Sequence, residues 1–281
     1  MSPLRQRMID AMRQHGFADR THESYLRIII DLARFHGRSP DELAQQDLQA
    51  YFDHLVRDRN LAPASCKVHR AGVRFLFLNV LGRTEFDCTA VVPKMAERIP
   101  ELLSASEVAR IIQATQNVKH RALLCTGYGC GLRVSELVAL LVRHIDGERR
   151  VLRVEQGKGA KDRHVALSAA MLDTLRVYWR TCRPREWLFP GRSGPLHVSS
   201  AQRTFERCKR LAGIEKIGGI HSLRHAYATH QLEAGLPVHR LQRNLGHRSL
   251  DTTMRYVHWV SDTSEVEQQH PDLVADLALV R

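Results

Sequence analysis

The feature that most constrains this chain is a helical hydrophobic periodicity that is interrupted once. Apolar side chains recur at helical spacing between Tyr25 and Phe35 and again between Leu48 and Val56, so each segment presents one apolar stripe to a common core. The periodicity lapses between residues 83 and 100 and then resumes. The sequence therefore predicts four helices in a domain over residues 1–84, a linker over 85–101 and a second domain over 102–281.

Local helix-start signals support this division. Ser39 and Glu42 have the spacing of a capping box, with a proline at the first helical position, and Ser104 and Glu107 repeat the spacing where the second domain begins. Pro63 opens a further helix that continues to residue 81. We expect a helix to begin at each of these three points.

One stretch of the second domain has a different pattern. Two β-branched runs, RVLRVEQ and RHVAL, flank GKGAKD between Val151 and Leu167, and glycine and aspartate are residues typical of hairpin turns. The expected fold is therefore mainly α, with a small antiparallel β-sheet in the second domain.

The chain is strongly basic. It has 42 Lys and Arg against 30 Asp and Glu, which gives a formal net charge of +12. This balance indicates a polyanionic partner such as nucleic acid, although general solubility is the alternative explanation. Lys67, Arg70 and Arg74 share one face of the helix that Pro63 opens. That face suits a phosphate backbone, and a solvated charged surface is the alternative.

Cysteine usage and hydropathy indicate the compartment. The six cysteines contain no CxxC pair, which favours reduced thiols in a cytosolic protein. Charges run through the first sixteen residues, and no window approaches the length of about 18 apolar residues that a membrane span needs. We expect a cytoplasmic protein without export or membrane insertion.

Several chemistries leave marks that this sequence lacks. No GxxxxGK[ST] loop is present for nucleotide hydrolysis, and the acidic residues are scattered rather than grouped for a two-metal site. His221 and His225 have the four-residue spacing of zinc-binding HExxH helices, but Ser222 stands where the glutamate belongs and Arg224 adds a cation. We therefore expect neither a metal nor another cofactor.

The second domain instead displays an arginine at a helix junction. Gly129 and Gly131 break one helix just before Arg133, and a new helix follows. Glu136, three residues further on, can hold the guanidinium in place, so a buried ion pair and a displayed cation are compatible interpretations.

Four later residues complete a set that can address one anion. His221 and Arg224 are three apart and share a helix face. His247 and Tyr256 are nine apart, which on one continuous helix would place them about 180° from each other. The chain must therefore turn between them, and residues 246–251 contain the glycine, serine and aspartate that make such a break.

Taken together, four ordered motifs resemble the tyrosine recombinases, the group of phage, transposon and Xer-type integrases and resolvases. The motifs are GLRVSEL, GKGAKDRHVAL, HSLRHAYATH and LGHRSLDTTMRYVH. The resemblance implies a core-binding domain over residues 1–84 and a catalytic domain over 102–281, which close around DNA as a C-shaped clamp. It also implies a nucleophile, Tyr256, and five catalytic cations, Arg133, Lys158, His221, Arg224 and His247.

The chemistry implied is strand exchange through a covalent phosphotyrosine, which keeps the bond energy without an energy cofactor. His221 is the candidate base for the phenol, and Arg133 with Arg224 suits the non-bridging phosphate oxygens. Lys158 is the candidate acid for the leaving 5′ oxygen. Lys161 is its rival and otherwise a candidate DNA contact.

The resemblance further implies double-stranded DNA with paired sites, a Holliday-junction intermediate and a tetramer in a bacterial, nucleoid-associated protein. An apolar stripe after Pro271, including Leu273 and Leu277, suits a tail that docks on a neighbouring protomer, with packing on its own domain as the alternative. A non-cutting DNA-binding regulator and a type IB topoisomerase-like relaxing enzyme remain alternative functions. The target sequence and the biological role stay open.

Overall fold

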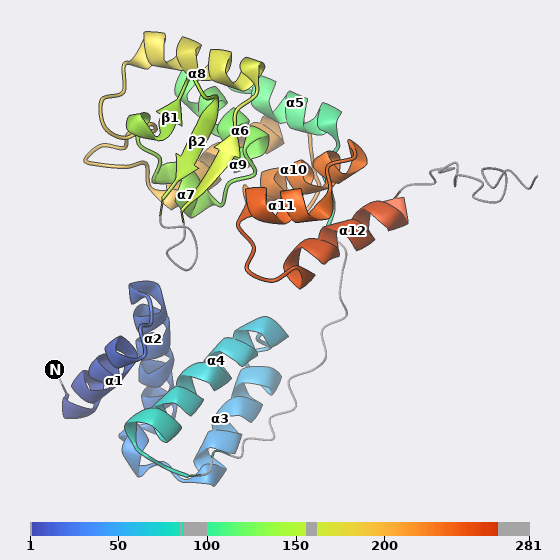
Figure 1. Cartoon of the computed structure of the whole chain (residues 1–281). Helices are drawn as coiled ribbons and strands as arrows, with labels where there is room; N and C mark the ends of the chain where they lie inside the picture. Colours follow the sequence, from blue (N-terminus) through green and yellow to red (C-terminus); the bar gives the residue numbers. More distant parts are fainter. Residues whose placement is uncertain (1, 85, 87–99, 156–161, 264–281) are drawn as a thin grey trace, which may run out of the picture. The chain divides into compact units, whose positions relative to one another are not determined.

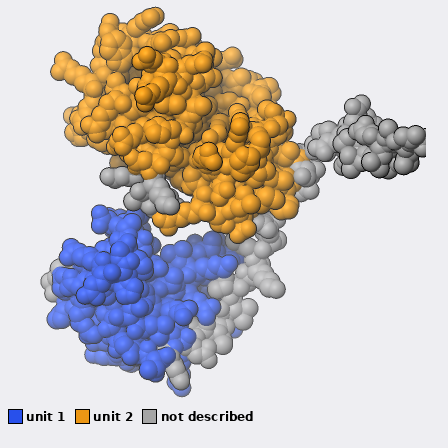
Figure 2. Space-filling view, viewed as in Figure 1, with its two compact units in different colours: residues 1–98 blue, residues 99–281 orange. Residues whose placement is uncertain are grey.

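The chain forms two compact units, residues 1–98 and 99–281 (Figure 2). This computed structural model describes residues 2–84, 86, 100–155 and 162–263. None of the helices in these ranges combines the length and the hydropathy that a membrane span requires. The family-derived expectations for Lys158, Lys161 and the tail after residue 263 fall outside the described residues.

Unit 1 contains the four predicted helices, and the second and third of them bury the two apolar stripes seen in the sequence. Leu32 from the second helix and Leu55 from the third are fully buried in one core with Met8 and Met12 from the first. The helices are α1 (Pro3–Gln14), α2 (Asp19–His36), α3 (Gln45–Arg57) and α4 (Pro63–Phe75), followed by a π-helical turn, Leu76–Val80 (Figure 1).

One predicted helix start in unit 1 is wrong. Ser39 precedes only a short 3₁₀ turn, Pro40–Glu42, and its hydroxyl donates to the Asp41 carboxylate instead of capping a backbone N–H. The following helix, α3, starts later, where the Asp47 carboxylate accepts from the backbone N–H of Ala44 at 2.8 Å. A side-chain partner two residues away thus competes with the backbone for the Ser39 hydroxyl.

Unit 2 is mainly helical, with a three-stranded antiparallel sheet in the order β1-β2-β3. The predicted antiparallel pairing is confirmed: β2 pairs with β3 in a register that sets Val151 opposite Ala166 and Val154 opposite Arg163. The predicted turn between them, GKGAKD, lies outside the described residues except for Asp162. The short strand β1 is an addition that the sequence did not indicate. The elements are α5 (Ala105–Gln113), α6 (Val118–Gly129), α7 (Val134–Val138), β1 (Ile145–Asp146), β2 (Val151–Val154), β3 (Arg163–Ala166), α8 (Ala169–Cys182), α9 (Val198–Leu211), α10 (His221–Glu233), α11 (Val238–Leu245) and α12 (Asp251–Thr263) (Figure 1).

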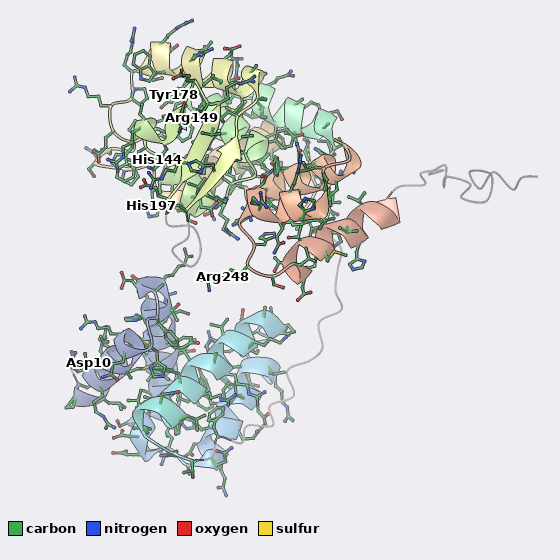
Figure 3. The ribbon with its side chains drawn as sticks, in the orientation of Figure 1. Asp10, His144, Arg149, Tyr178, His197 and Arg248 are labelled. Carbon is green, nitrogen blue, oxygen red and sulfur yellow. The ribbon has the colours of Figure 1, made fainter. Side chains whose placement is uncertain are left out.

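The core of unit 2 is built around α6, which packs against α8 on one side and α10 on another. Tyr178 of α8 is fully buried, and its hydroxyl donates to the carbonyl of Leu188 at 2.8 Å, so this polar atom has a partner inside the core (Figure 3). The predicted capping box at Ser104 and Glu107 is present at the start of α5. The five described cysteines are free thiols.

Candidate active site

The break between α6 and α7 positions Arg133. Gly131 adopts a φ of +59°, and a Cβ at this position would lie 2.3 Å from Cδ1 of the Tyr227 ring. Only glycine therefore fits both the left-handed turn and the close approach. The turn places Arg133 at the N-cap of α7 with its side chain 21% exposed, so its guanidinium stays accessible.

Glu136 lies beneath Arg133 and is the buried centre of the site. Its side chain is 5% exposed, and it accepts hydrogen bonds from the Arg133 Nη1 at 2.8 Å and the Arg133 backbone N–H at 2.9 Å. The expected ion pair between these two residues is therefore present. Burial raises the pKa of Glu136, but hydrogen bonds and charge from Arg163 and then Arg133 outweigh it and hold the pKa at about 2.

Arg163 is a member of this site that none of the sequence motifs singled out. It lies on β3, and its Nη1 and Nη2 donate to the two carboxylate oxygens of Glu136 at 2.9 and 2.7 Å. The available signal was strand alternation, because Arg163 shares the inward face of β3 with the buried Val165. An arginine at an inward strand position requires a buried acceptor.

Arg224 reaches the same carboxylate from α10. Its side chain is 4% exposed, and its Nη1 lies 3.8 Å from the Glu136 Oε2. The backbone carbonyls of Gly131 and Leu245 accept from its guanidinium at 2.8 and 2.7 Å. Burial, followed by the charge of Arg133, lowers the pKa of Arg224 to about 10, so the group stays charged at neutral pH.

His247 lies against Arg224. Its Nε2 is 3.0 Å from the Arg224 Nη2, and its Nδ1 is 2.9 Å from the Thr253 Oγ1. Burial, followed by the charge of Arg224, lowers the pKa of His247 to about 4, so the ring is neutral at pH 7. Because a guanidinium can only donate, Nε2 must accept, and the single ring proton is therefore on Nδ1.

Tyr256 completes the cluster from α12. The predicted turn before this helix is present: Ser249 accepts from the Asp251 backbone N–H at 3.1 Å where α12 begins. The Tyr256 ring is stacked on His247, with ring centroids 6.1 Å apart and an interplanar angle of 5°. Its side chain is buried, and burial raises its pKa, while the charge and hydrogen bonding of Arg224 act in the opposite direction.

The histidine that contacts the Tyr256 hydroxyl is His225. Its Nδ1 lies 3.1 Å from the hydroxyl oxygen, and burial, followed by the charge of His221, lowers the pKa of His225 to about 4. The sequence pattern indicated His225 only as a possible zinc ligand, and this contact was not foreseen. The one available signal was its place beside Arg224 in HSLRH.

His221, the predicted base, lies at the first residue of α10 and is exposed. Partial desolvation of its ring by neighbouring protein atoms, followed by the charge of Arg224, lowers its pKa below the ordinary value of 6.5, so a neutral imidazole is favoured at pH 7. The structure thus brings Arg133 and Arg224 to Glu136, places His247 and Tyr256 against Arg224, and leaves His221 at the edge.

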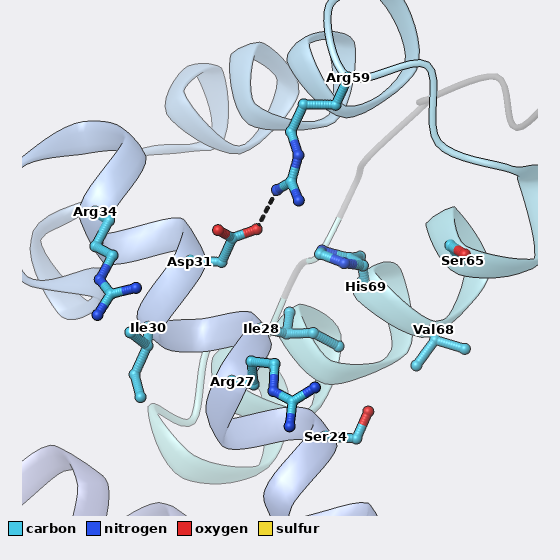
Figure 4. A pocket seen from close by; sticks show the side chains of 10 residues that line it. All are labelled: Ser24, Arg27, Ile28, Ile30, Asp31, Arg34, Arg59, Ser65, Val68 and His69. Atoms are coloured by element: carbon cyan, nitrogen blue, oxygen red, sulfur yellow. Dashed lines mark hydrogen bonds and ion pairs between the residues drawn. The ribbon is translucent and has the colours of Figure 1, made fainter. Parts of the chain in front are cut away.

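Unit 1 carries the predicted DNA-contacting cations. Lys67, Arg70 and Arg74, here called the α4 basic face, are all exposed on that helix. A groove between α2 and α4 includes Arg27 and Arg34, which extend from α2, but its lining does not include the α4 basic face (Figure 4). Unit 1 therefore has basic side chains on α2 at this groove and a separate basic face on α4.

The charge of the site in unit 2 favours an anion. Arg133, Arg163 and Arg224 face a single carboxylate, Glu136, which leaves an excess of two positive charges. In the described part of the chain, no three His, Cys, Asp or Glu side chains are grouped so that they could hold a metal ion. The arrangement is suited to grip a phosphate with forked N–H donors and to present a phenol beside it.

Comparison with known families gives the class of this protein. Residues 101–262 match the phage integrase family, and residues 4–85 match the phage integrase N-terminal SAM-like domain. The chain therefore belongs to the phage integrase family, the tyrosine recombinases.

Two relatives show how closely sequences in this family resemble the chain. A putative integrase/recombinase, y4qK, of Sinorhizobium fredii is 43% identical over 260 residues, which cover 92% of this chain and 84% of that protein. The tyrosine recombinase XerD of Pseudomonas putida is 34% identical over 281 residues, with 91% and 92% covered.

Solved structures show the same fold. The XerA recombinase is 27% identical, with a TM-score of 0.54 over 91% of this chain and 92% of that one. An integrase of the Tn1549 transposon, in complex with transposon right end DNA, has a TM-score of 0.72 at 17% identity, with 90% and 94% covered. The XerH site-specific recombinase, bound to a palindromic difH substrate after cleavage, has a TM-score of 0.65 at 21% identity, with 85% and 73% covered.

Proposed function

We propose that this recombinase cleaves and rejoins DNA at specific sites through a 3′-phosphotyrosine formed on Tyr256. The observation that supports this most directly is the placement of the Tyr256 ring against His247, with Arg224 and Arg133 close enough to oppose the rise that burial causes in the pKa of Tyr256. A phenol held beside two guanidinium groups is positioned to attack a phosphate that those groups bind.

The cations match the charge that develops during attack. A phosphodiester carries one negative charge and gains a second as the phenolate oxygen adds to phosphorus, and the site has an excess of two positive charges. Arg133 and Arg224 bind the non-bridging oxygens. A bound phosphate raises the pKa of His247, because the anion stabilises its charged ring, so that His247 can then donate to the same oxygens.

The phenol must lose its proton as it attacks, because its ordinary pKa is about 10. His221 is the proposed acceptor, since it is exposed and its lowered pKa keeps it neutral at pH 7. His225 holds the hydroxyl in the chain without DNA. As the new P–O bond forms, the 5′ oxygen leaves and takes a proton from Lys158.

Two further steps make this a recombination reaction. The free 5′ hydroxyl of a second strand attacks the phosphotyrosine and releases Tyr256, so that no bond energy is lost. Paired sites held by a tetramer carry this exchange through a Holliday junction. The two units close on each duplex as a C-shaped clamp, with the α4 basic face on the phosphate backbone and the tail after residue 263 docked on a neighbour.

The test is formation of a covalent adduct. Target duplexes are first selected from random-sequence DNA by their binding to the Tyr256→Phe variant. They are then end-labelled and nicked at successive positions. Cleavage close to a nick releases a short fragment, which diffuses away, so that the strand cannot be rejoined and the covalent adduct accumulates. The wild-type chain should produce a labelled species that survives denaturing electrophoresis and is removed by protease. Tyr256→Phe should produce none, and adduct in that variant would disprove the assignment of the nucleophile.

Tyr128 provides the matched control. Its hydroxyl also contacts a histidine, with the Nδ1 of His230 at 2.9 Å, but it lies on α6 outside the arginine cluster. Tyr128→Phe should form the adduct as the wild type does. Selected binding without any adduct in the wild type would favour the non-cutting regulator, and relaxation of supercoiled plasmid by dilute protein without a specific site would favour the topoisomerase-like enzyme.

A further inference from the structure

We propose that Arg163 is a positioning residue that fixes two groups of the recombinase site at once: Arg133 through Glu136, and His247 through the end of α11. This inference rests on the proposed function, since it concerns the geometry in which Tyr256 attacks. Arg163 lies on β3. Arg133, by contrast, lies at the start of α7, and His247 lies at the start of the connection between α11 and α12.

The first link is the bidentate pair with Glu136. Each carboxylate oxygen accepts two hydrogen bonds, one from the Arg163 fork and one from Arg133, so that all four lone-pair positions of Glu136 are used. A carboxylate held in this way cannot rotate. The guanidinium of Arg133 is therefore fixed by a residue that it does not touch.

The second link runs to His247. The Arg163 Nε donates to the carbonyl of Asn244 at 2.9 Å, in the last turn of α11. The aliphatic part of Arg163 lies over Gly246, where a Cβ would come within 3.0 Å of its Cδ. The residue directly before His247 is thus packed against the same side chain that holds Glu136.

Loss of the two Arg163 hydrogen bonds would also allow the carboxylate of Glu136 to rotate toward Arg224. Its Oε2 lies 3.8 Å from the Nη1 of Arg224, a separation it can close once Arg163 no longer holds it. Glu136 would then compete with the substrate phosphate for Arg224. Lysine cannot replace arginine here, because one ammonium group does not bind two carboxylate oxygens in parallel and a carbonyl in a third direction.

The experiment uses the full chain and the nicked duplex of the adduct assay, with protein in excess so that the single-turnover rate of adduct formation is measured. Arg163→Lys should lower this rate on the order of 100-fold, the cost of about 1 Å of misplacement, while the dissociation constant for the duplex stays near the wild-type value. The matched control is Arg153→Lys, because Arg153 is an exposed arginine of β2 that also pairs across the hairpin, with Asp162 at 2.8 Å. This control should react at the wild-type rate.

A double-mutant cycle separates positioning from a general loss of structure. If Arg163 acts through Glu136, then Arg163→Lys should cost much less in a Glu136→Gln background than in the wild type. A wild-type rate in Arg163→Lys, or a cost that adds in full to that of Glu136→Gln, would overturn the proposal. If Arg163→Lys does not fold, the neutral pair Glu136→Gln/Arg163→Gln replaces it and should show the same slow adduct formation.

A second readout needs no DNA and keeps the two proposals apart. Nitrogen-15 NMR of the histidine rings should show His247 with its proton on Nδ1 in the wild type and in Arg153→Lys, and a changed tautomer balance in Arg163→Lys. An unchanged His247 ring would overturn the second link. Absence of any adduct from the wild type would instead refute the proposed function, and the NMR comparison would still decide whether Arg163 positions His247.

Discussion

Replacing Glu136 with glutamine tests the charge balance of the site through the pH dependence of stability. The carboxyl has a pKa of about 2 in the folded chain, against an ordinary value of 4.5. A carboxyl with a lower pKa in the folded than in the unfolded chain stabilises folding when it is ionised. This contribution is complete above about pH 4.5 and is lost as the pH falls toward 2, because the unfolded chain binds the proton first.

The two pKa values set the magnitude. Their difference corresponds to about 3 kcal/mol of unfolding free energy at neutral pH. Protonation of the unfolded chain reduces this contribution by about 1 kcal/mol at pH 4 and by almost half of its full value at pH 3.5. Glutamine keeps the volume of the side chain but cannot ionise. The histidines with lowered pKa values also lose stability in acid, but this loss is common to both proteins and largely cancels in their difference.

The assay is urea denaturation followed by tryptophan fluorescence. All three tryptophans, Trp179, Trp187 and Trp259, belong to unit 2, so the signal reports the unfolding of that unit within the full chain. Wild type should exceed Glu136→Gln by about 3 kcal/mol at pH 7 and by roughly half of that at pH 3.5. A difference that is independent of pH would refute the reasoning. Glu148→Gln, at an exposed site, should change stability by less than about 0.5 kcal/mol.

Three other outcomes follow from the same structure. In the fluorescence assay, Gly131→Ala should cost about 2–4 kcal/mol, because it adds left-handed strain to a clash with Tyr227. Gly147→Ala should cost much less, because its Cβ would meet only Leu172 at an ordinary contact distance of 3.8 Å. Replacing all three residues of the α4 basic face with alanine should weaken DNA binding. The slope of the logarithm of the binding constant against the logarithm of the salt concentration should become shallower by about one unit for each phosphate that is no longer neutralised. An unchanged slope would show that the DNA does not contact this face. His221→Ala should slow adduct formation by about 100-fold or more if His221 accepts the phenol proton, and by more than His225→Ala does. The reverse order would assign the proton to His225.

Local patterns predicted the elements well where the partners are close in the chain. The capping box at Ser104 and the helix break at Gly131 each depend on residues within a few positions of one another, and the paired strands β2 and β3 are at most 15 positions apart; each of these features is present. The predicted capping box at Ser39 is wrong for an equally local reason, because the Ser39 hydroxyl donates its hydrogen bond to the Asp41 carboxylate. Short-range signals leave such competition undecided.

The sequence by itself determined a basic chain with two helical regions, one hairpin and an ordered set of cations and a tyrosine. Only the tertiary structure decided which of these groups meet. Glu136 and Arg163 are 27 positions apart, and His225 and Tyr256 are 31 apart, so no periodicity relates them. Their contacts exist because β3, α7, α10 and α12 pack together, and a charged side chain that is buried by this packing needs a partner of opposite charge or a hydrogen bond. One carboxylate, Glu136, thereby holds the arginines of the site in place.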